Sequence, residues 1–546
     1  MSTESTQPIQ YAAALGAITL AYYLVPYLHD PYDYRHRFSG PWLAGLSSWW
    51  VSYAALAGKQ CDALREQHEK YGKFVRIGPN HISISDPDAL EAVYGHRSGA
   101  LKSDFYDNPG AGTPSVFSER NKAEHTRMRK RIANIFSQQN VLNFEPRVRE
   151  HIIRLCEQWD LRCKEAVQGA SGSNWTAQNG YALMDCCAQF SYLTFDIIGD
   201  LALGAPFGLI QAQKDSSPII ESVDKFGQPE KETIRLPVVE AIASINRNLA
   251  STGPFPLWTR YLMKILPWNI PSLRREIRFF KLAIAVVDAR LKRGPMTMSD
   301  GSQGVDFIDK LLQVRNEDGS EMSRDELYSE TLTMLLAGSD TSSNTLSSLC
   351  YYLAIHPDMQ RELQSELDKH VPVASSASEE QAPPMIPSSD VVPDYEHIKN
   401  LPYLNACVKE ALRIHSTIGM GLPRVVPPGK TLTVAGQTFK AGSVISVPSY
   451  MTHRSSIWGA DASEFRPERW LDENAGSFNK YFAPFSLGPR SCIGRNLAYM
   501  ELMLIAATVF RRYSIEAIPE TKMNIDDTFI RAVVNCQVAF KRRDLV

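Results

Sequence analysis

FSLGPRSCIG occupies residues 485–494, near the end of a chain of 546 residues. A run with apolar side chains at helical spacing, residues 496–512, follows it almost at once. Cys492 therefore precedes the N-terminus of a predicted helix, where free N–H groups and the helix dipole stabilise a sulfur anion. The pattern favours a cysteine that ligates a metal over one that pairs with another cysteine.

The other residues of this loop also suit a bound ligand. Gly488 and Gly494 permit tight backbone turns close to a flat molecule, and Arg490 can meet a carboxylate through two hydrogen bonds. The alternative is a chance glycine-rich turn around a buried cysteine. Five fixed residues in the order F-x-x-G-x-R-x-C-x-G are expected by accident in about one such chain in ten thousand.

The composition places the chain among folded proteins of nearly neutral charge. Hydrophobic residues make up 44% and charged residues 22%, and the formal net charge is −2. These values exclude a mostly disordered, collagen-like or polytopic membrane protein, and they provide no field that would attract nucleic acid as a partner. The nine cysteines are scattered without a C-x-x-C pair, which is typical of a reducing compartment.

Residues 11–28 form an uncharged run of 18 residues, near the ~20 that a helix needs to cross a bilayer. We expect a membrane anchor with its flank in residues 1–37. A cleaved signal peptide is the second interpretation, but no basic residue precedes the run and no small-residue cleavage site follows it. A buried core helix is the third interpretation. Because Arg35 and Arg37 follow the run, the positive-inside rule places residues 38–546 in the cytosol.

Helical periodicity dominates the remaining chain, so we predict a mainly α fold with a minor β region (α+β), built as a single domain. The predicted helices are residues 123–137, 145–159, 182–203, 273–293, 324–355, 359–370, 403–412 and 496–512. A hairpin is predicted at 74–86, with strands at 431–434, 444–447 and 533–540. Residues 371–394 are rich in Pro, Ser, Ala and Glu and lack periodicity, which predicts a flexible surface insertion.

Two polar residues interrupt an apolar helical run at 332–355. Asp340 and Thr341 are costly to bury there unless they have a function. The hydroxyl of Thr341 can hold dioxygen or water and pass protons, and Gly338 removes side-chain bulk where a ligand could lie against the helix. The alternative is that the two polar residues cap or kink the helix.

The loop at 485–494 resembles the haem-binding loop of the cytochrome P450 family. AGSDTS at 337–342 is similar to the oxygen-activating groove of that family, and the motifs occur in the family's order. The resemblance covers nearly the whole chain after the anchor. It implies the cytochrome P450 fold preceded by one transmembrane helix, a haem b whose iron is bound by the Cys492 thiolate, and a monooxygenase that takes one oxygen atom from O2.

The resemblance also implies roles for individual residues. Asp340 and Thr341 deliver protons to the bound oxygen. Glu410, Arg413 and Arg466 form a structural network on the haem side of the fold. The residues expected to bind haem are His125, Arg129, Arg424, Phe485, Gly488, Arg490, Cys492 and Gly494. His125 and its basic neighbours also fit a solvated basic face or a docking patch for an acidic reductase.

The substrate pocket is expected at the segment after the second helix of the family fold, the central helix and the loop at 416–422. The candidate residues are Phe105, Tyr106, Val116, Phe117, Met334, Ala337, Leu422 and Phe529. This placement follows the family's geometry alone. It identifies no group that would pair with a substrate carboxylate.

The stretches at 71–96, 120–137 and 191–208 are similar to fungal microsomal members of the benzoate 4-monooxygenase branch. This resemblance implies para-hydroxylation of benzoate or a related aromatic acid, with electrons from NADPH through cytochrome P450 reductase. It also implies a single-pass protein in the endoplasmic reticulum membrane, in contact with lipid, with its catalytic domain facing the cytosol. The alternatives are an oxidase of terpenoid, polyketide or stilbene carbon, and a non-catalytic haem-binding protein.

Overall fold

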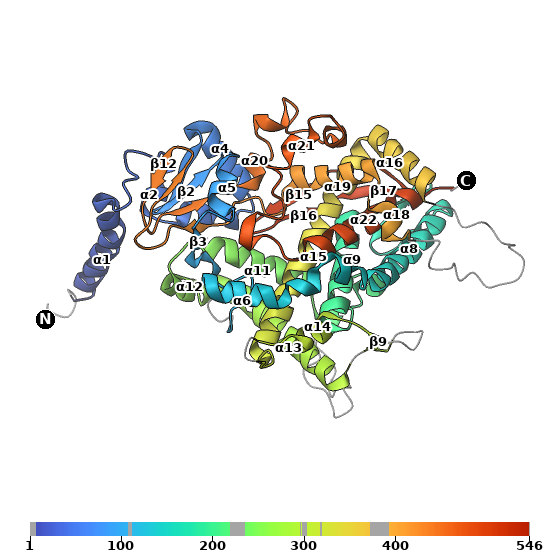
Figure 1. Cartoon of the computed structure of the whole chain (residues 1–546), viewed down its shortest axis with the longest axis horizontal. Helices are drawn as coiled ribbons and strands as arrows, with labels where there is room; N and C mark the ends of the chain where they lie inside the picture. Colours follow the sequence, from blue (N-terminus) through green and yellow to red (C-terminus); the bar gives the residue numbers. More distant parts are fainter. Residues whose placement is uncertain are drawn as a thin grey trace, which may run out of the picture.

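The computed structural model describes seven parts of the chain: residues 7–107, 112–218, 235–294, 296–297, 303–316, 319–371 and 392–544. Within them the fold is mainly helical with a smaller β region, as the sequence predicts (Figure 1). Most of the predicted insertion at 371–394, namely residues 372–391, lies outside the described residues.

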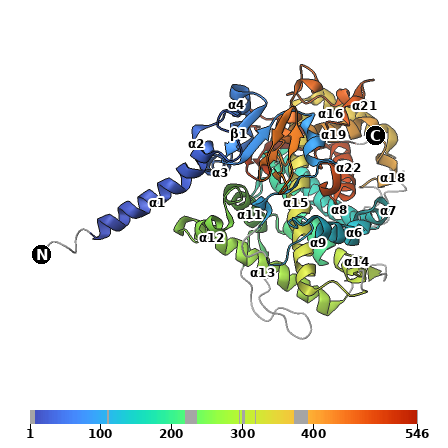
Figure 2. The same cartoon turned by 60° about the vertical axis from the view of Figure 1, so that its left-hand side comes forward.

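Helix α15, Arg324–Ile355, runs through the middle of the molecule (Figures 1 and 2). A capping box begins it, because the Ser323 side chain accepts from the N–H of Glu326 and the Glu326 side chain accepts from the N–H of Ser323. Helix α15 packs most extensively against α9, Cys186–Leu203, and also against α19, Pro402–His415, and α22, Arg495–Arg512. The predicted central helix is therefore confirmed, and its mostly buried surface explains its apolar sequence.

Gly338 brings α9 and α15 together. A Cβ atom at this position would lie 2.6 Å from the Cδ1 atom of Ile198 on α9, closer than real contacts allow. The missing side chain therefore makes room for a neighbouring helix. The prediction that Gly338 opens space for a ligand is wrong, because the Cα–H bond that a Cβ would replace points toward α9.

Most predicted helices match observed ones within a few residues, although the helix predicted at 145–159 continues to Val167. They are α6, Lys122–Ala133; α8, Glu145–Val167; α13, Ile270–Arg293; and α16, Pro357–His370. The sequence analysis does not identify α11, Val238–Thr252, or α12, Leu257–Lys264. The buried residues Val238, Ile242 and Ile245 of α11 nevertheless recur at helical spacing, which is the signal that could have found it.

The helix predicted at 182–203 begins four residues later, at Cys186. Residues Tyr181–Asp185 instead form strand β5, whose side chains alternate in burial. Strand β5 pairs with β17, Gln537–Arg542, in a four-stranded sheet that also contains β14, Tyr513–Glu516, and β4, Trp175–Gln178. The Asp185 side chain then accepts a hydrogen bond from the N–H of Cys187 and caps α9.

A five-stranded sheet lies on the side of the molecule where the N-terminal helix emerges (Figure 1). Its strands, in spatial order, are β1, Phe74–Gly78; β2, His81–Ile84; β13, Val444–Ser446; β10, Arg424–Val425; and β3, Leu101–Lys102. The predicted hairpin at 74–86 is thus confirmed as β1 and β2. Strands β3 and β10 pair in a register that places Lys102 opposite Arg424.

Helix α1, Gln7–His29, projects away from the rest of the molecule (Figure 2). Its residues 10–29 are apolar and long enough to cross a membrane, and none is buried. The chain joins the folded body directly afterwards, where Tyr34 and Phe38 are buried in a core cluster. The arrangement makes α1 a candidate membrane anchor and contradicts the interpretation of a buried core helix.

Candidate active site

Cys492 lies between the short 3₁₀ helix η6, Gly488–Arg490, and the first turn of α22. It is exposed, whereas the other eight cysteines are all buried. Partial removal from water raises the pKa of the Cys492 thiol, while a hydrogen bond from the backbone of Gly494 and the charges of Arg129 and Arg495 lower it. The thiol is therefore open to a ligand and has neighbours that stabilise its anion.

The loop that carries Cys492 is held by its own backbone and by α6. Gly488 has φ +66°, and a Cβ atom there would lie 2.3 Å from the carbonyl oxygen of Tyr94, so that only glycine fits. The backbone N–H of Cys492 donates to the carbonyl of Phe485 over 2.8 Å. Arg129 Nη1 donates to the carbonyl of Ser491 over 2.7 Å, which ties α6 to the loop. The turn predicted at Gly488 is therefore present. The group that approaches Gly488 closely is the protein backbone at Tyr94, however, and not the flat ligand that the sequence analysis expects.

One face of α15 is open in the middle of the molecule. Ala337 is exposed and Thr341 is half-buried, whereas Met334, one turn before Ala337, is buried. The Thr341 hydroxyl donates to the carbonyl of Ala337 over 2.8 Å. A small molecule can therefore reach this stretch of the helix.

Asp340 points to a neighbouring helix. Its Oδ2 atom accepts a hydrogen bond from Nδ2 of Asn246 on α11 over 2.9 Å. Burial raises the pKa of Asp340 to about 7, although this hydrogen bond lowers it. The carboxyl group therefore exchanges its proton near neutral pH. The alternative that Asp340 caps a helix fails, because α15 is continuous from Arg324 to Ile355.

Positively charged side chains from four separate segments converge beside the cysteine loop. The set comprises three residues predicted at the haem, Arg129, Arg424 and Arg490, and one that the sequence analysis missed, Lys102. Burial first, and then repulsion from Arg424, Arg490 and Arg129, places the pKa of Lys102 well below its ordinary value. Strand pairing with β10 brings Lys102 here, and no local sequence signal indicates that pairing.

His125 lies within this group of cations. It is buried on α6, and its pKa is lowered to about 3, first by burial and then by Arg490, Lys102 and the other two arginines. The ring is therefore neutral at pH 7. Its neighbours Arg127 and Arg131 lie on another side of α6, where both bind Glu326. The basic run of α6 thus divides into a side toward the cysteine loop and a side paired with α15.

The side chains present fit a haem. Within the described part of the chain, the hydrogen-bond partners of the four cations are carbonyl and hydroxyl oxygens: Arg424 donates to the Tyr106 hydroxyl, and Arg490 donates to the carbonyls of Glu119 and Arg120. Converging cations without a carboxylate partner suit a group that brings two carboxylates of its own, as haem propionates do. Cys492 would supply the sulfur ligand to the haem iron.

Four aromatic side chains gather near the cations and form what we call the aromatic cluster: Phe105, Tyr106, Phe117 and Phe529. The ring centroids of Phe105 and Phe529 are 6.2 Å apart, and those of Tyr106 and Phe117 are 5.6 Å apart. Leu422 packs against the same cluster. The structure thus brings together five of the predicted substrate residues. Met334 and Val116 lie in the main core. All of these stay predictions as substrate contacts.

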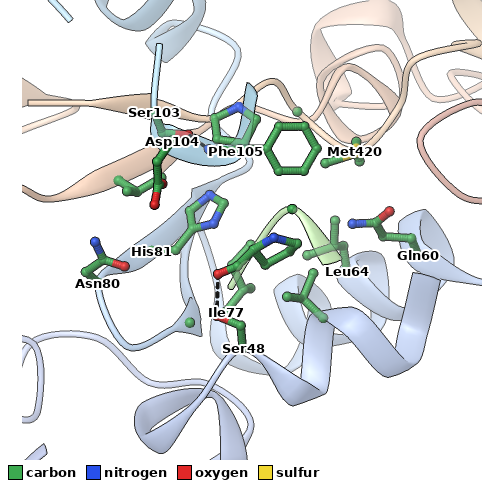
Figure 3. A pocket seen from close by; sticks show the side chains of 17 residues that line it. Ser48, Gln60, Leu64, Ile77, Asn80, His81, Ser103, Asp104, Phe105 and Met420 are labelled. Atoms are coloured by element: carbon green, nitrogen blue, oxygen red, sulfur yellow. Dashed lines mark hydrogen bonds between the residues drawn. The ribbon is translucent and has the colours of Figure 1, made fainter. Parts of the chain in front are cut away.

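A small pocket borders the aromatic cluster on the side of hairpin β1–β2 (Figure 3). Phe105 and Met420 form one wall, and Ile77 and His81 form another. The Ser48 hydroxyl donates to the carbonyl of Pro254 over 2.9 Å beside the pocket. Phe105 therefore belongs both to the wall of this pocket and to the aromatic cluster.

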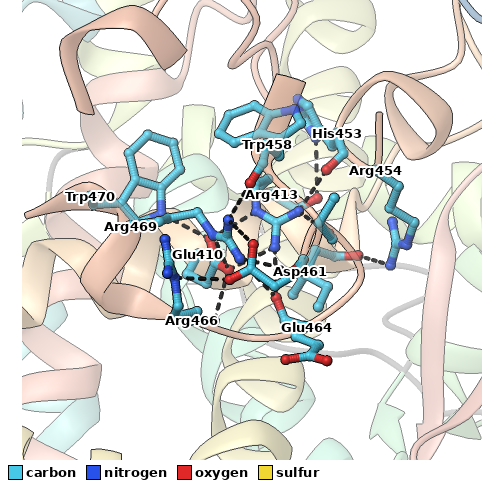
Figure 4. A network of polar contacts seen from close by, with 12 residues as sticks. Glu410, Arg413, His453, Arg454, Trp458, Asp461, Glu464, Arg466, Arg469 and Trp470 are labelled. Carbon is cyan, nitrogen blue, oxygen red and sulfur yellow. Dashed lines mark hydrogen bonds and ion pairs between the residues drawn. The ribbon is translucent and has the colours of Figure 1, made fainter. Parts of the chain in front are cut away.

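A buried polar network holds α19 to residues 453–470 (Figure 4). Arg413 donates two hydrogen bonds to the carboxylate of Glu410, at 2.8 and 2.7 Å, and Arg469 Nε donates to Glu410 Oε1 over 2.9 Å. Arg466, the predicted third member, reaches Glu410 only through its backbone N–H, which donates to Oε1 over 2.9 Å, so the prediction for its side chain is wrong. Its side chain is 43% exposed and binds acids near the surface, because the 3₁₀ helix η5, Pro467–Trp470, turns Arg469 inward in its place.

Comparisons with known proteins agree with this site. A family model described as Cytochrome P450 matches residues 43–540. Benzoate 4-monooxygenase of Aspergillus niger is 37% identical over 98% of both chains. Pisatin demethylase of Fusarium vanettenii is 29% identical over 91% of this chain and 88% of its own length. With an exposed Cys492 beside converging cations and a family match over most of its length, the chain belongs to the cytochrome P450 family of monooxygenases, which hold a haem iron through a cysteine thiolate.

Proposed function

We propose that this protein hydroxylates benzoate, or a related aromatic acid, at the para position. The observation that carries the proposal is the 37% identity to a benzoate 4-monooxygenase over 98% of both chains. The site supports it, because an aromatic cluster for the ring lies next to a group of cations suited to anions. Relatives named for other activities, such as pisatin demethylase, are less similar.

The bound haem supplies the binding of O2 and its activation for insertion into a C–H bond. The protein's part begins with the Sγ atom of Cys492, which ligates the iron. Asp340 takes up and releases a proton at its carboxyl group, and Asn246 orients that group by its hydrogen bond to Oδ2. The Thr341 hydroxyl on the open face of α15 passes the proton onward.

Electrons come from NADPH through a cytochrome P450 reductase in this proposal. Helix α1 crosses the endoplasmic reticulum membrane in contact with lipid, and the catalytic domain faces the cytosol because Arg35 and Arg37 follow the span. Helix α6 exposes Lys122 and Lys130 and contacts the cysteine loop through Arg129. This surface fits an acidic partner that delivers electrons close to Cys492.

The test uses the full-length protein with a fungal reductase in microsomes, supplied with benzoate and NADPH. Formation of 4-hydroxybenzoate, detected by mass spectrometry and chromatographic comparison with the 2- and 3-isomers, is the expected result. Cys492→Ala microsomes are the matched control and form no product. A normal carbon monoxide spectrum without any hydroxybenzoate would contradict the proposal and favour a terpenoid, polyketide or stilbene substrate.

A further inference from the structure

His453, a member of the buried polar network in Figure 4, also contacts the chain that leads into the cysteine loop. It directly follows the short helix α20, Ser449–Thr452, and is fully buried. Its carbonyl accepts a hydrogen bond from Nη1 of Arg413 over 2.6 Å, and its Nε2 atom accepts one from the backbone N–H of Ala483 over 3.1 Å. Ala483 lies two residues before Phe485, where the loop begins. An imidazole ring therefore connects the network to the loop.

The hydrogen-bond partners of this ring determine its protonation state. A backbone N–H can only donate, so Nε2 carries no hydrogen and the ring hydrogen lies on Nδ1. Nδ1 is 2.9 Å from Oγ of Ser416 and 3.2 Å from the carbonyl oxygen of Arg413, and both oxygens can accept from it. Burial, and then the positive charges of Arg413 and Arg454, lower the pKa of His453 to about 3, so the ring is neutral at pH 7. The neutral ring is a fixed acceptor for Ala483.

The turn that follows Ala483 has a strained backbone. Ser486 has φ +57°, in the left-handed region that favours glycine, and its N–H donates to the carbonyl of Ala483 over 3.1 Å. Such a conformation persists only where the surrounding contacts hold it in place. The carbonyl of Phe485, one residue earlier, accepts from the N–H of Cys492 over 2.8 Å. A displacement of Ala483 therefore reaches Cys492 through a short stretch of backbone and two hydrogen bonds.

His453 acts on the loop backbone and not on the reacting atoms. Both of its ring nitrogens are engaged by the protein, so the ring has no polar group left for haem or substrate. The rings of Trp458 and Phe482, each with its centroid 5.9 Å from that of His453, restrict the orientation of the imidazole. Arg129 holds the other end of the loop through the carbonyl of Ser491. The loop is thus supported from two elements, one on each side of its turn.

We propose that His453 is a positioning residue for the Cys492 sulfur, because its hydrogen bond to Ala483 holds the cysteine loop in the conformation in which the sulfur ligates the haem iron. Without this bond the buried N–H of Ala483 loses its acceptor, which is costly, so the loop gains by leaving the conformation that ligation requires. The inference concerns the haem ligand and not the substrate. It therefore holds or fails independently of the para-hydroxylation of benzoate.

The experiment records the reduced carbon monoxide spectrum of the purified holoenzyme, in which the thiolate-ligated form and the form without thiolate ligation give separate bands. In His453→Gln the amide oxygen can lie near the position of Nε2 and accept from Ala483, whereas the shorter side chain in His453→Asn reaches only the position of Nδ1. We expect the ratio of the form without thiolate ligation to the ligated form to rise about fivefold in His453→Asn, equivalent to about 1 kcal/mol, and to stay within about twofold of wild type in His453→Gln.

Gln360→Met is the matched control for a general loss of stability. Gln360 donates to the carbonyls of Leu353 and Ile515 and accepts from the N–H of Ile515, so its loss removes buried bonds to backbone groups outside the cysteine loop. We expect this variant to lower the thermal midpoint and to leave the ratio of the two spectral forms unchanged at temperatures where the protein stays folded.

Three results would overturn the proposal. The first is an unchanged ratio in His453→Asn, and the second is an equal rise in Gln360→Met, which would assign the effect to stability. The third is an equal rise, or loss of haem, in both His453→Asn and His453→Gln, because the imidazole would then serve the fold as a whole and not the bond to Ala483.

Discussion

Asp340 and Glu501 are two buried acids that retain protons for the same physical reason. Burial raises the pKa of Asp340 to about 7 and that of Glu501 to about 8, and each has one amide or hydroxyl donor to offset the loss of water. Asp340 lies beside Thr341 in sequence and joins α15 to α11. Glu501 joins α15 to α22 through Ser342. We therefore expect Asp340 to affect the reaction and Glu501 to affect stability.

Replacing Thr341 by alanine should uncouple NADPH consumption from product formation. The hydroxyl on the open face of α15 is lost, so that protons are no longer delivered in register with oxygen activation. The ratio of hydroxylated product to NADPH consumed should fall several-fold. Thr345→Ala is the matched control, because its hydroxyl lies one turn further on in a buried place. An unchanged ratio in Thr341→Ala would reject the assigned role.

Glu501→Gln should stabilise the protein at alkaline pH. The folded-state pKa of about 8 lies above the ordinary value of 4.5, so the folded protein binds the additional proton. The favourable contribution of the protonated acid is complete below pH 4.5 and is lost as the pH rises through 8. Glutamine carries no charge at any of these pH values, so it avoids that loss. We expect the free energy of unfolding of the variant to exceed that of the wild type by on the order of 2 kcal/mol at pH 9 and by little at pH 5. Thermal unfolding of the holoenzyme at both pH values measures this, and an equal gain at each would contradict it.

We expect the stability of the contact between η5 and α19 to depend strongly on Arg469 and little on Arg466. Arg469→Met leaves the fully buried carboxylate of Glu410 with one cation fewer, which costs about 3–5 kcal/mol for a broken buried pair. Arg466→Met removes a pair that is 43% exposed at the arginine, worth at most about 1 kcal/mol. Thermal unfolding midpoints should therefore fall steeply for the first variant alone. Similar losses in both would favour the original assignment to Arg466.

The contact between α9 and α15 can be tested through Gly338. Alanine at this position would collide with Ile198, and overpacking of this kind costs about 1–3 kcal/mol. Ile198→Ala removes the colliding atoms at the expense of a cavity. In a double-mutant cycle the combined variant should lose clearly less stability than the sum of the single variants. Additive losses would show that the two residues do not constrain each other.

Features of the site formed by residues close together in the sequence could be predicted, whereas those formed by distant segments could not. Cys492, the turn at Gly488 and the start of α22 lie within a few residues of one another, so that local chemistry indicates them. Lys102 joins the site only through pairing with a strand more than three hundred residues away, and a sequence shows no such partner. Arg466 and Arg469 are three residues apart, and only the turn of η5 decides between them.

For the whole molecule, the boundary between anchor and folded body lies between α1 and Tyr34. Deletion of residues 1–29 should release the protein from membranes and keep its carbon monoxide spectrum, because no residue from 10 to 29 is buried in a core. Deletion of residues 1–40 removes Tyr34 and Phe38, whose aromatic rings contact each other in a buried cluster. The longer deletion should lower the thermal midpoint markedly. Retention of both proteins on membranes would show that α1 is not the main anchor.

The pairing of Lys102 with Arg424 places like charges face to face on the last two strands of a sheet. Such a pair weakens the contact between the strands and bound anions would strengthen it, so the stability of this sheet edge is coupled to binding of the prosthetic group. A newly made chain in a cell short of iron or porphyrin would therefore hold this sheet edge less firmly than a haem-loaded one. Protein quality control could then distinguish immature chains from mature ones by this edge, and cofactor supply would determine the lifetime of the polypeptide.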